Sequence, residues 1–166
     1  MNYEDNLMLW SESPEYWVSI FFIIGYVSMV MHELGHALTA HLIGAKVTQL
    51  NFGKPVFPVP LRISSVKIYL GLPLGGRCYY EWINVNNTTP WRSAIVQVGG
   101  WIADATFLIF VVASGSTNNN SIAYMLYLYL WVKVIFGITP ITGDGRALLS
   151  DLKMGLQNPI FHNKGH

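Results

Sequence analysis

The amino-acid sequence predicts an α-helical polytopic membrane protein with three transmembrane helices and a small membrane-associated β region between the first and second helices. Three observations predict this class. Of the 166 residues, 52% are hydrophobic and only 11% are charged, whereas soluble domains contain about 25% charged residues. Three apolar stretches approach the roughly 20 residues that a spanning helix needs. The basic residues are also distributed unevenly along the chain.

The composition and length exclude several other classes. So few charges exclude an intrinsically disordered chain. The net charge of +1, without a basic stripe, argues against a nucleic-acid partner. The length favours one domain, and the single cysteine, Cys78, cannot form an internal disulfide. The alternative of a soluble protein with three apolar core helices is disfavoured by the lengths of the stretches and by the charge distribution.

The three predicted spans cover about residues 17–43, 91–112 and 122–138. The first opens with WVSIFFIIGYVSMVM, which contains no charge. Because no Lys or Arg precedes it and its apolar run is too long for a signal sequence, we expect it to be retained. The second is apolar except for Arg92, Gln97 and Asp104, and Lys133 is the only charge in the third.

The region between the first two spans, about residues 46–80, has a different pattern. KVTQLNF and RISSVKIYL are rich in β-branched and aromatic residues, and GKPVFPVP between them breaks any helix. We predict a short sheet or a pair of hairpins here, followed by the glycine-rich turn GLPLGG at 71–76.

The basic residues predict the orientation in the membrane. Of the ten, six lie in 45–92 and three in 146–166, whereas residues 1–16 and 114–121 contain none. Because Lys and Arg mark cytoplasmic loops, we expect the N-terminus outside and both the 45–90 region and the C-terminus in the cytoplasm.

The motif His32-Glu33-Leu34-Gly35-His36 is the main candidate for a chemical site. Residues i and i+4 of a helix lie about 40° apart around its axis, so both imidazoles point to one side. Two neutral imidazoles supply half of a tetrahedral zinc site, and the glutamate between them is placed to take a proton from a metal-bound water. Ionisable groups so deep in a span are functional by default. The alternative is a pair of interfacial histidines with a snorkelling glutamate.

The third metal ligand has two acidic candidates. Asp144 follows a proline break after the third span, and its local sequence fits equally well a cap on a helix formed by GRALLSDLKMG. The predicted topology favours Asp144 as a ligand, because its segment and the end of the first span lie near the same membrane face. Asp104 lies within the second span, where we expect it to hydrogen-bond within the bundle or to tune the site.

These motifs resemble those of the site-2 protease family, a group of intramembrane zinc metalloproteases, over most of residues 17–150. The specific parts are HELGH and Asp144-Gly145, and the weaker parts are PLGG at 73–76 and Gly-Gly at 99–100. The resemblance implies that His32, His36 and Asp144 bind Zn2+ and that Glu33 is the general base. It also implies that residues 1–166 form a single intramembrane metalloprotease core whose β region holds the substrate as an extended strand.

Two motifs depart from this family's usual pattern. The second-span motif is commonly Gly-Pro followed by an Asn, whereas here it reads GGWIAD, with Asp104 in place of the Asn. The usual Asn-Leu-x-Pro stretch before Asp-Gly is replaced by FGITPITGDG, which contains no Asn. The oxyanion-stabilising residue is therefore unassigned. No PDZ module or regulatory domain fits in this length, so we expect substrate selection by the core or by a separate adaptor or regulatory protein.

The predicted function is hydrolysis of peptide bonds in membrane-anchored or signal-peptide-like substrates by an integral, multi-pass membrane enzyme, with Glu33 activating a zinc-bound water. The expected partners are a membrane-embedded peptide or protein substrate and the lipid bilayer. The alternative is a catalytically idle relative, a membrane binding or chaperone-like module of the same fold. The apolar spans disfavour a soluble zinc peptidase, and the lack of repeats disfavours a small transporter subunit.

Overall fold

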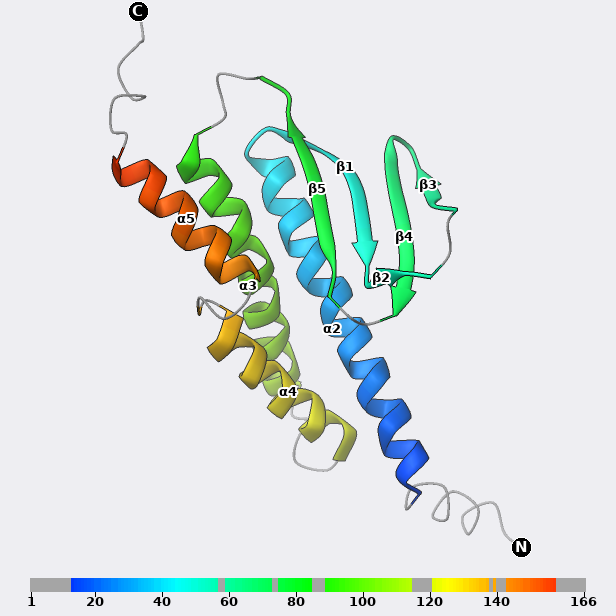
Figure 1. Ribbon diagram of the computed structural model, residues 1–166. Coiled ribbons are helices and arrows are strands. Elements are labelled where there is room, and N and C mark those ends of the chain that lie inside the picture. The colour runs from blue at the N-terminus through cyan, green and yellow to red at the C-terminus, as the bar shows by residue number, and fades with distance from the viewer. Residues whose placement is uncertain are drawn as a thin grey trace, which may run out of the picture.

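The computed structural model describes residues 13–56, 59–72, 75–84, 89–114, 121–137, 139 and 143–157. They form a five-stranded sheet and four helices, which are α2 (Pro14–Leu42), α3 (Pro90–Ala113), α4 (Ser121–Gly137) and α5 (Gly143–Gln157). The sheet lies alongside the C-terminal half of α2, whose N-terminal half extends past it (Figure 1). Three segments discussed above lie at least partly outside the described residues. They are Pro73 and Leu74 of PLGG, residues 115–120 of the connection that contains no Lys or Arg, and Pro140.

The two long helices begin at side-chain caps. The Ser13 hydroxyl accepts a hydrogen bond from the Tyr16 amide at 3.2 Å, and the Thr89 hydroxyl accepts one from the Arg92 amide at 3.3 Å. A proline follows each cap, where its fixed φ suits a helix and its missing N–H costs nothing. Local sequence therefore fixes where both helices start.

The prediction of three membrane-spanning helices is wrong. Within the described residues, only α2 and α3, with 29 and 24 residues, have the length and composition to cross a membrane. The third apolar stretch forms α4, which has 17 residues and is therefore about 25 Å long at 1.5 Å per residue, short of a hydrocarbon layer of about 30 Å. The chain then continues into a further helix, α5, so this is not a three-helix polytopic fold.

The β region is also larger and more complex than predicted. It is a mixed sheet with the order β2-β4-β1-β5, and β3 also pairs with β4. The strands are β1 (Ala45–Phe52), β2 (Lys54–Pro55), β3 (Leu61–Ile63), β4 (Val66–Leu72) and β5 (Arg77–Trp82). The central pair, β1 and β4, is parallel, with Leu50 opposite Ile68. A parallel pair requires a crossover, which the proline-rich segment between them supplies, whereas two simple hairpins would have been antiparallel throughout.

Three small apolar clusters hold these elements together. The first joins α2 to the sheet, the second joins the end of α2 to β1 and α3, and the third joins α3 to α4. Their buried members are Met29, Leu50 and Phe52; Ala40, Ala45 and Val96; and Leu108, Val111 and Leu130.

The outer faces of the long helices remain apolar and exposed. Only 28% of the most apolar part of α2, and 33% of that of α3, is buried inside the molecule. Exposed side chains include Phe21, Phe22 and Ile23 on α2 and Ile109 and Phe110 on α3. Contiguous apolar surface of this extent marks a contact with a membrane or another protein.

Two glycines let α2 and α3 approach each other closely. A Cβ on Gly35 would lie 2.6 Å from the Cβ of Ala103 and would overlap the Gly99 carbonyl oxygen, and a Cβ on Gly99 would lie 2.7 Å from the Cβ of Thr39. Small residues at a helix–helix contact allow such close packing. The HELGH turn of α2 is therefore pressed directly against α3.

Candidate metal centre

The two histidines of HELGH meet on one side of α2. Their ring centroids are 4.7 Å apart, the rings are nearly perpendicular, and 3.1 Å separates the Nε2 atoms of His32 and His36. The spacing of four residues in a helix produces this arrangement.

Asp144 joins the pair from the first turn of α5. Its Oδ2 lies 2.8 Å from His32 Nε2 and 3.5 Å from His36 Nε2. Burial alone would raise the pKa of the Asp144 carboxyl, but hydrogen bonds to both histidines and their charges together hold that pKa well below its usual range. The local sequence around Asp144 fits a helix cap and a metal ligand equally well, and the predicted topology favours the ligand. In the structure it lies inside the first turn of α5 and points at the imidazoles.

The His32 Nε2, His36 Nε2 and Asp144 Oδ2 atoms match the dimensions of a zinc site. His32, His36 and Asp144 are the described residues whose potential ligand atoms cluster in this way. With bonds of about 2.0–2.1 Å, tetrahedral zinc places its ligand atoms roughly 3.3 Å apart, and the distances here are 2.8, 3.1 and 3.5 Å. Two imidazoles and one carboxylate also form a donor set of catalytic zinc sites, which keep a fourth position open.

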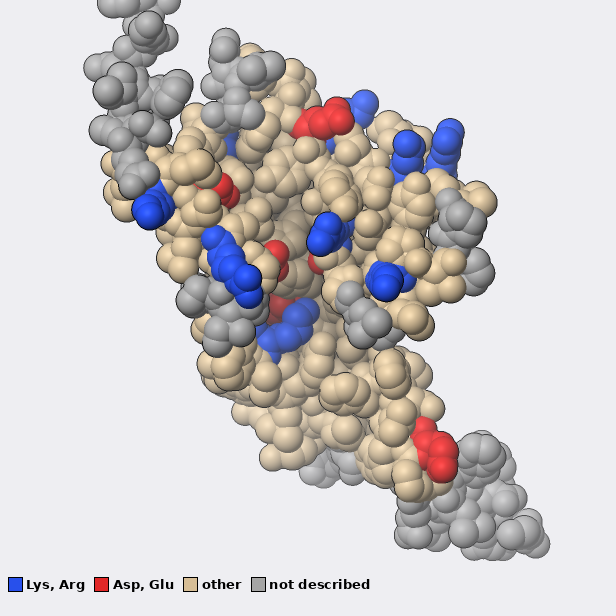
Figure 2. Space-filling view, in the orientation of Figure 1, with Lys and Arg blue, Asp and Glu red and all other residues tan. Residues whose placement is uncertain are grey.

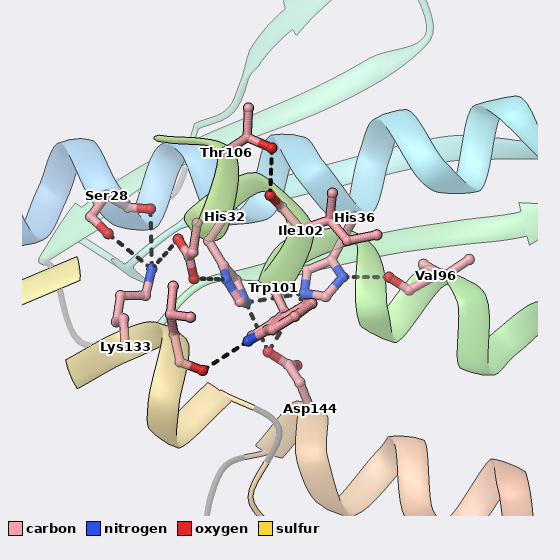
Figure 3. A network of polar contacts seen from close by, with 11 residues as sticks. Ser28, His32, His36, Val96, Trp101, Ile102, Thr106, Lys133 and Asp144 are labelled. Atoms are coloured by element: carbon pink, nitrogen blue, oxygen red, sulfur yellow. Dashed lines mark hydrogen bonds and ion pairs between the residues drawn. The ribbon is translucent and has the colours of Figure 1, made fainter. Parts of the chain in front are cut away.

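Hydrogen bonds from the other ring nitrogens fix the orientation of both imidazoles (Figure 3). His36 Nδ1 lies 2.7 Å from the Val96 carbonyl oxygen, and His32 Nδ1 lies 2.7 Å from Asp104 Oδ2. A carbonyl can only accept a hydrogen bond, as can an ionised carboxylate, so both Nδ1 atoms donate. Nε2 is then the nitrogen of each ring that remains for a metal, and it is directed at Asp144.

Glu33 is buried beside this cluster, with 5% of its surface exposed. Its Oε2 atom is buried and has no hydrogen-bond partner among the described residues. The segment before β5 packs closely on it, because a Cβ on Gly76 would lie 2.5 Å from Glu33 Cγ. A buried carboxylate oxygen without a partner is costly, and such groups are expected where a proton or a ligand is handled.

A central cavity of about 580 Å³ opens onto these groups. Its lining comes from α2, the segment before β5, α3, α4 and α5, and it includes Glu33, Asp104, Lys133 and Asp144. Figure 2 shows a hollow in which acidic side chains lie at depth with basic side chains around them. Its volume is in the range of about 300–1,000 Å³ that is usual for ligand sites.

Three contributions to the site were not predicted from the sequence. The Val96 carbonyl is a backbone group and gives no sequence signal. Gly100 is one half of a glycine pair in the sequence, and that pair gives no sign that a Cβ at Gly100 would lie 2.5 Å from His36 Nε2. Lys133 was visible as the only charge in its apolar stretch, and it lies 2.9 Å from Asp104 Oδ1.

The comparison with known protein families found a matching family model. The model of peptidase family M50 matches residues 20–160, which include the HELGH helix, the sheet and Asp144. This family consists of membrane-associated metalloproteases. Because the match covers most of the sequence, the chain belongs to peptidase family M50, the site-2 protease family.

Proposed function

We propose that this protein is an intramembrane zinc endopeptidase that hydrolyses membrane-anchored or signal-peptide-like substrates. The observation that carries the proposal is the position of Glu33. Its unpartnered Oε2 is buried at a cavity that also contains His32 and Asp144. A base next to a metal site, with room for a substrate, is the arrangement that metal-assisted hydrolysis requires.

In this proposal His32, His36 and Asp144 hold Zn2+. When bound, zinc supplies a Lewis acid that polarises a carbonyl and lowers the pKa of a coordinated water to about 7. Glu33 accepts the proton that the attacking water loses, and it later gives that proton to the amine that leaves when the peptide C–N bond breaks. Burial of Glu33 limits competing contacts with bulk water.

The free edge of β5 is the proposed binding surface for the substrate backbone. Among the described strands β5 pairs only with β1, and Cys78, Tyr79 and Tyr80 line a smaller cavity together with Glu33 and Asp144. A helical substrate must unwind before its carbonyl groups are accessible, and pairing with a strand edge satisfies the freed backbone groups where water is scarce. The β5 edge is next to the proposed catalytic groups.

The proposed topology places the N-terminus outside and the C-terminus in the cytoplasm. α5 packs against α3 close to the start of α3, at the same end of the long helices as the sheet (Figure 1). The sheet region and α5 contain most of the basic residues, which favours one cytoplasmic face for both.

The test is the substitution Glu33→Gln in the full chain, purified in detergent. We expect cleavage of a membrane-anchored or signal-peptide-like test substrate to fall by at least about 10²-fold, because the proton acceptor is lost, while bound zinc measured by elemental analysis stays at the wild-type level. Glu15→Gln makes the same chemical change at the exposed, distant end of α2 and should leave both quantities unchanged.

Two outcomes would contradict the proposal. Undiminished cleavage by Glu33→Gln would exclude Glu33 as the base. A wild-type protein that binds zinc but cleaves no substrate with an unwound, membrane-anchored segment would instead favour the catalytically idle, chaperone-like alternative.

A further inference from the structure

A partly buried polar chain runs from the metal centre into the helical bundle. It starts at His32 on α2, passes through Asp104 on α3 and ends at Lys133 on α4, which also contacts Ser28 on α2 (Figure 3). These residues lie far apart in the sequence and come from three helices. None of the groups proposed for catalysis requires Asp104 or Lys133, so the position of this ion pair next to the metal centre needs its own explanation.

Asp104 is surrounded by protein, with 1% of its surface exposed. Its two oxygens have different partners, since Oδ2 lies 2.7 Å from His32 Nδ1 and Oδ1 lies 2.9 Å from Lys133 Nζ. The ammonium group of Lys133 can only donate, so Asp104 Oδ1 accepts from it, and Oδ2 is the acceptor that faces His32 Nδ1. The carboxylate thereby fixes the ring's tautomer and directs Nε2 toward Asp144.

Lys133 is equally well matched to its surroundings. Its three ammonium hydrogens have three acceptors, which are Asp104 Oδ1 at 2.9 Å, Ser28 Oγ at 3.0 Å and the Ser28 carbonyl oxygen at 3.2 Å. A buried carboxylate without a counter-ion is strongly destabilising. Lys133 supplies that counter-ion, and it also ties α4 to the α2 turn that precedes His32.

The two imidazoles are therefore supported differently. His36 donates to a neutral carbonyl, that of Val96, whereas His32 donates to a carboxylate. A carboxylate behind a ligating histidine orients the ring and increases its basicity as a ligand, and its loss typically reduces metal affinity or activity about 10- to 100-fold. The aspartate places a stronger acceptor behind one histidine and needs a lysine to be stable there.

We propose that Asp104 is a positioning residue for the metal centre and that Lys133 is its obligate counter-ion, so that His32, Asp104 and Lys133 act as one unit. This inference rests on the proposed function insofar as the histidines bind zinc. It does not require that the protein cleaves a substrate. Asp104 touches a ligand and not the substrate, and its effect is on how tightly and in what geometry the metal is held.

The experiment compares Asp104→Asn, Lys133→Met and the double variant with wild type, all as full chains in detergent. Zinc affinity is measured by competition with a chromophoric chelator, the ligand geometry by the visible absorption spectrum of the Co2+-substituted protein, and folding by the Tm of the metal-free protein. Trp101→Phe is the matched control, because the Trp101 indole also joins α3 to α4, through a 2.8 Å hydrogen bond to the Val134 carbonyl, but has no hydrogen bond to His32.

We expect Asp104→Asn to lower zinc affinity about 10- to 100-fold and to shift the Co2+ spectrum. Each single variant should lower the Tm, because each breaks the ion pair between Asp104 and Lys133. The loss should be larger for Lys133→Met, which leaves the buried Asp104 side chain without its counter-ion. The double variant should recover much of the Tm, since both charges are gone, but should not recover zinc affinity. Trp101→Phe should lower the Tm and leave zinc affinity and the Co2+ spectrum as in wild type.

Three results would overturn the inference. If Asp104→Asn binds zinc as tightly as wild type, Asp104 does not position the metal centre. If the double variant recovers the full zinc affinity, Asp104 serves only to neutralise the charge of Lys133. A Tm of the double variant below both single variants would refute the counter-ion role. If a single variant fails to fold, the zinc affinity and Co2+ spectrum of the double variant still test the positioning role. Wild-type protein that binds zinc without cleaving would refute the proposed function and leave this inference standing.

Discussion

Gly100 on α3 is the position where the smallest change should have the largest effect on the metal centre. In Gly100→Ala the added methyl carbon would lie 2.5 Å from His36 Nε2, 2.7 Å from His36 Cε1 and 2.8 Å from His32 Cε1. Ordinary contacts between such atoms are about 3.5 Å, so the rings must move by roughly 1 Å or the helices must separate. Neither ring is free to turn away, because the Nδ1 atoms of both are hydrogen-bonded.

The expected loss of zinc affinity in Gly100→Ala follows from how little displacement a zinc ligand tolerates. Ligand distances in zinc sites hold to about ±0.2 Å, which is well below the displacement that the methyl group imposes. Overpacking of this kind costs about 1–3 kcal/mol, and if that cost falls on the zinc-bound geometry the affinity should drop about 5- to 150-fold. Gly25→Ala is the control, because its added Cβ would lie 3.7 Å from the Tyr129 hydroxyl, an ordinary contact.

The assay is chelator competition on both variants, with the Tm of the metal-free protein as a check on folding. Gly25→Ala should bind zinc as wild type does, with a slightly higher Tm, because alanine stabilises a helix by about 0.5–1 kcal/mol relative to glycine. Equal zinc affinity of Gly100→Ala and wild type, in a protein that retains its fold, would refute the placement of α3 against the histidines.

Two further predictions concern the core and the cysteine. Leu130 is completely buried between α3 and α4, so Leu130→Ala should lower the free energy of unfolding in detergent by about 2–5 kcal/mol, and a loss below about 1 kcal/mol would contradict the packing. Burial, followed by the charge of Glu33, raises the pKa of Cys78 from 9.0 to about 12. Alkylation of native protein at pH 8 should therefore be much slower than that of denatured protein. Folding favours the neutral thiol, so the contribution of Cys78 to the free energy of unfolding is complete below pH 9 and is lost as the pH rises toward 12. Equal alkylation rates of native and denatured protein would contradict a protonated, shielded thiol.

Much of the site could be predicted from the sequence, because its parts are local. Two histidines four residues apart with a glutamate between them need only a helix to share a face, and helix geometry is the same in every protein. Ser13 and Thr89, each followed by proline, define helix starts in the same local way. The apolar stretches likewise predicted helices, since α2, α3 and α4 match the expected ranges within three residues at each end.

The number of spans and the β topology could not be predicted in this way. Apolar composition gives the same signal for a helix that crosses a membrane and for one that packs against its neighbours. The expected stretch at 122–138 and α4 are equally long, at 17 residues, so the helix was predicted correctly and its assignment as a membrane span was wrong. The parallel pairing of β1 with β4 depends on the course of the segment between them, and strand pattern alone contains no information on that course.

The sequence by itself determined the chemistry available to this protein, namely two imidazoles, a glutamate and a distant Asp-Gly pair in an apolar chain. The predicted topology favours Asp144 over Asp104 as the ligand, but only the tertiary structure decided that both aspartates contact His32, with Asp144 at Nε2 and Asp104 at Nδ1. Asp144 and Asp104 are 112 and 72 positions from His32, and contacts over such separations arise from helix packing. The physical reason is that periodicity fixes a side chain's direction on its own helix, whereas the close approach at Gly35, Gly99 and Gly100 fixes what that side chain meets.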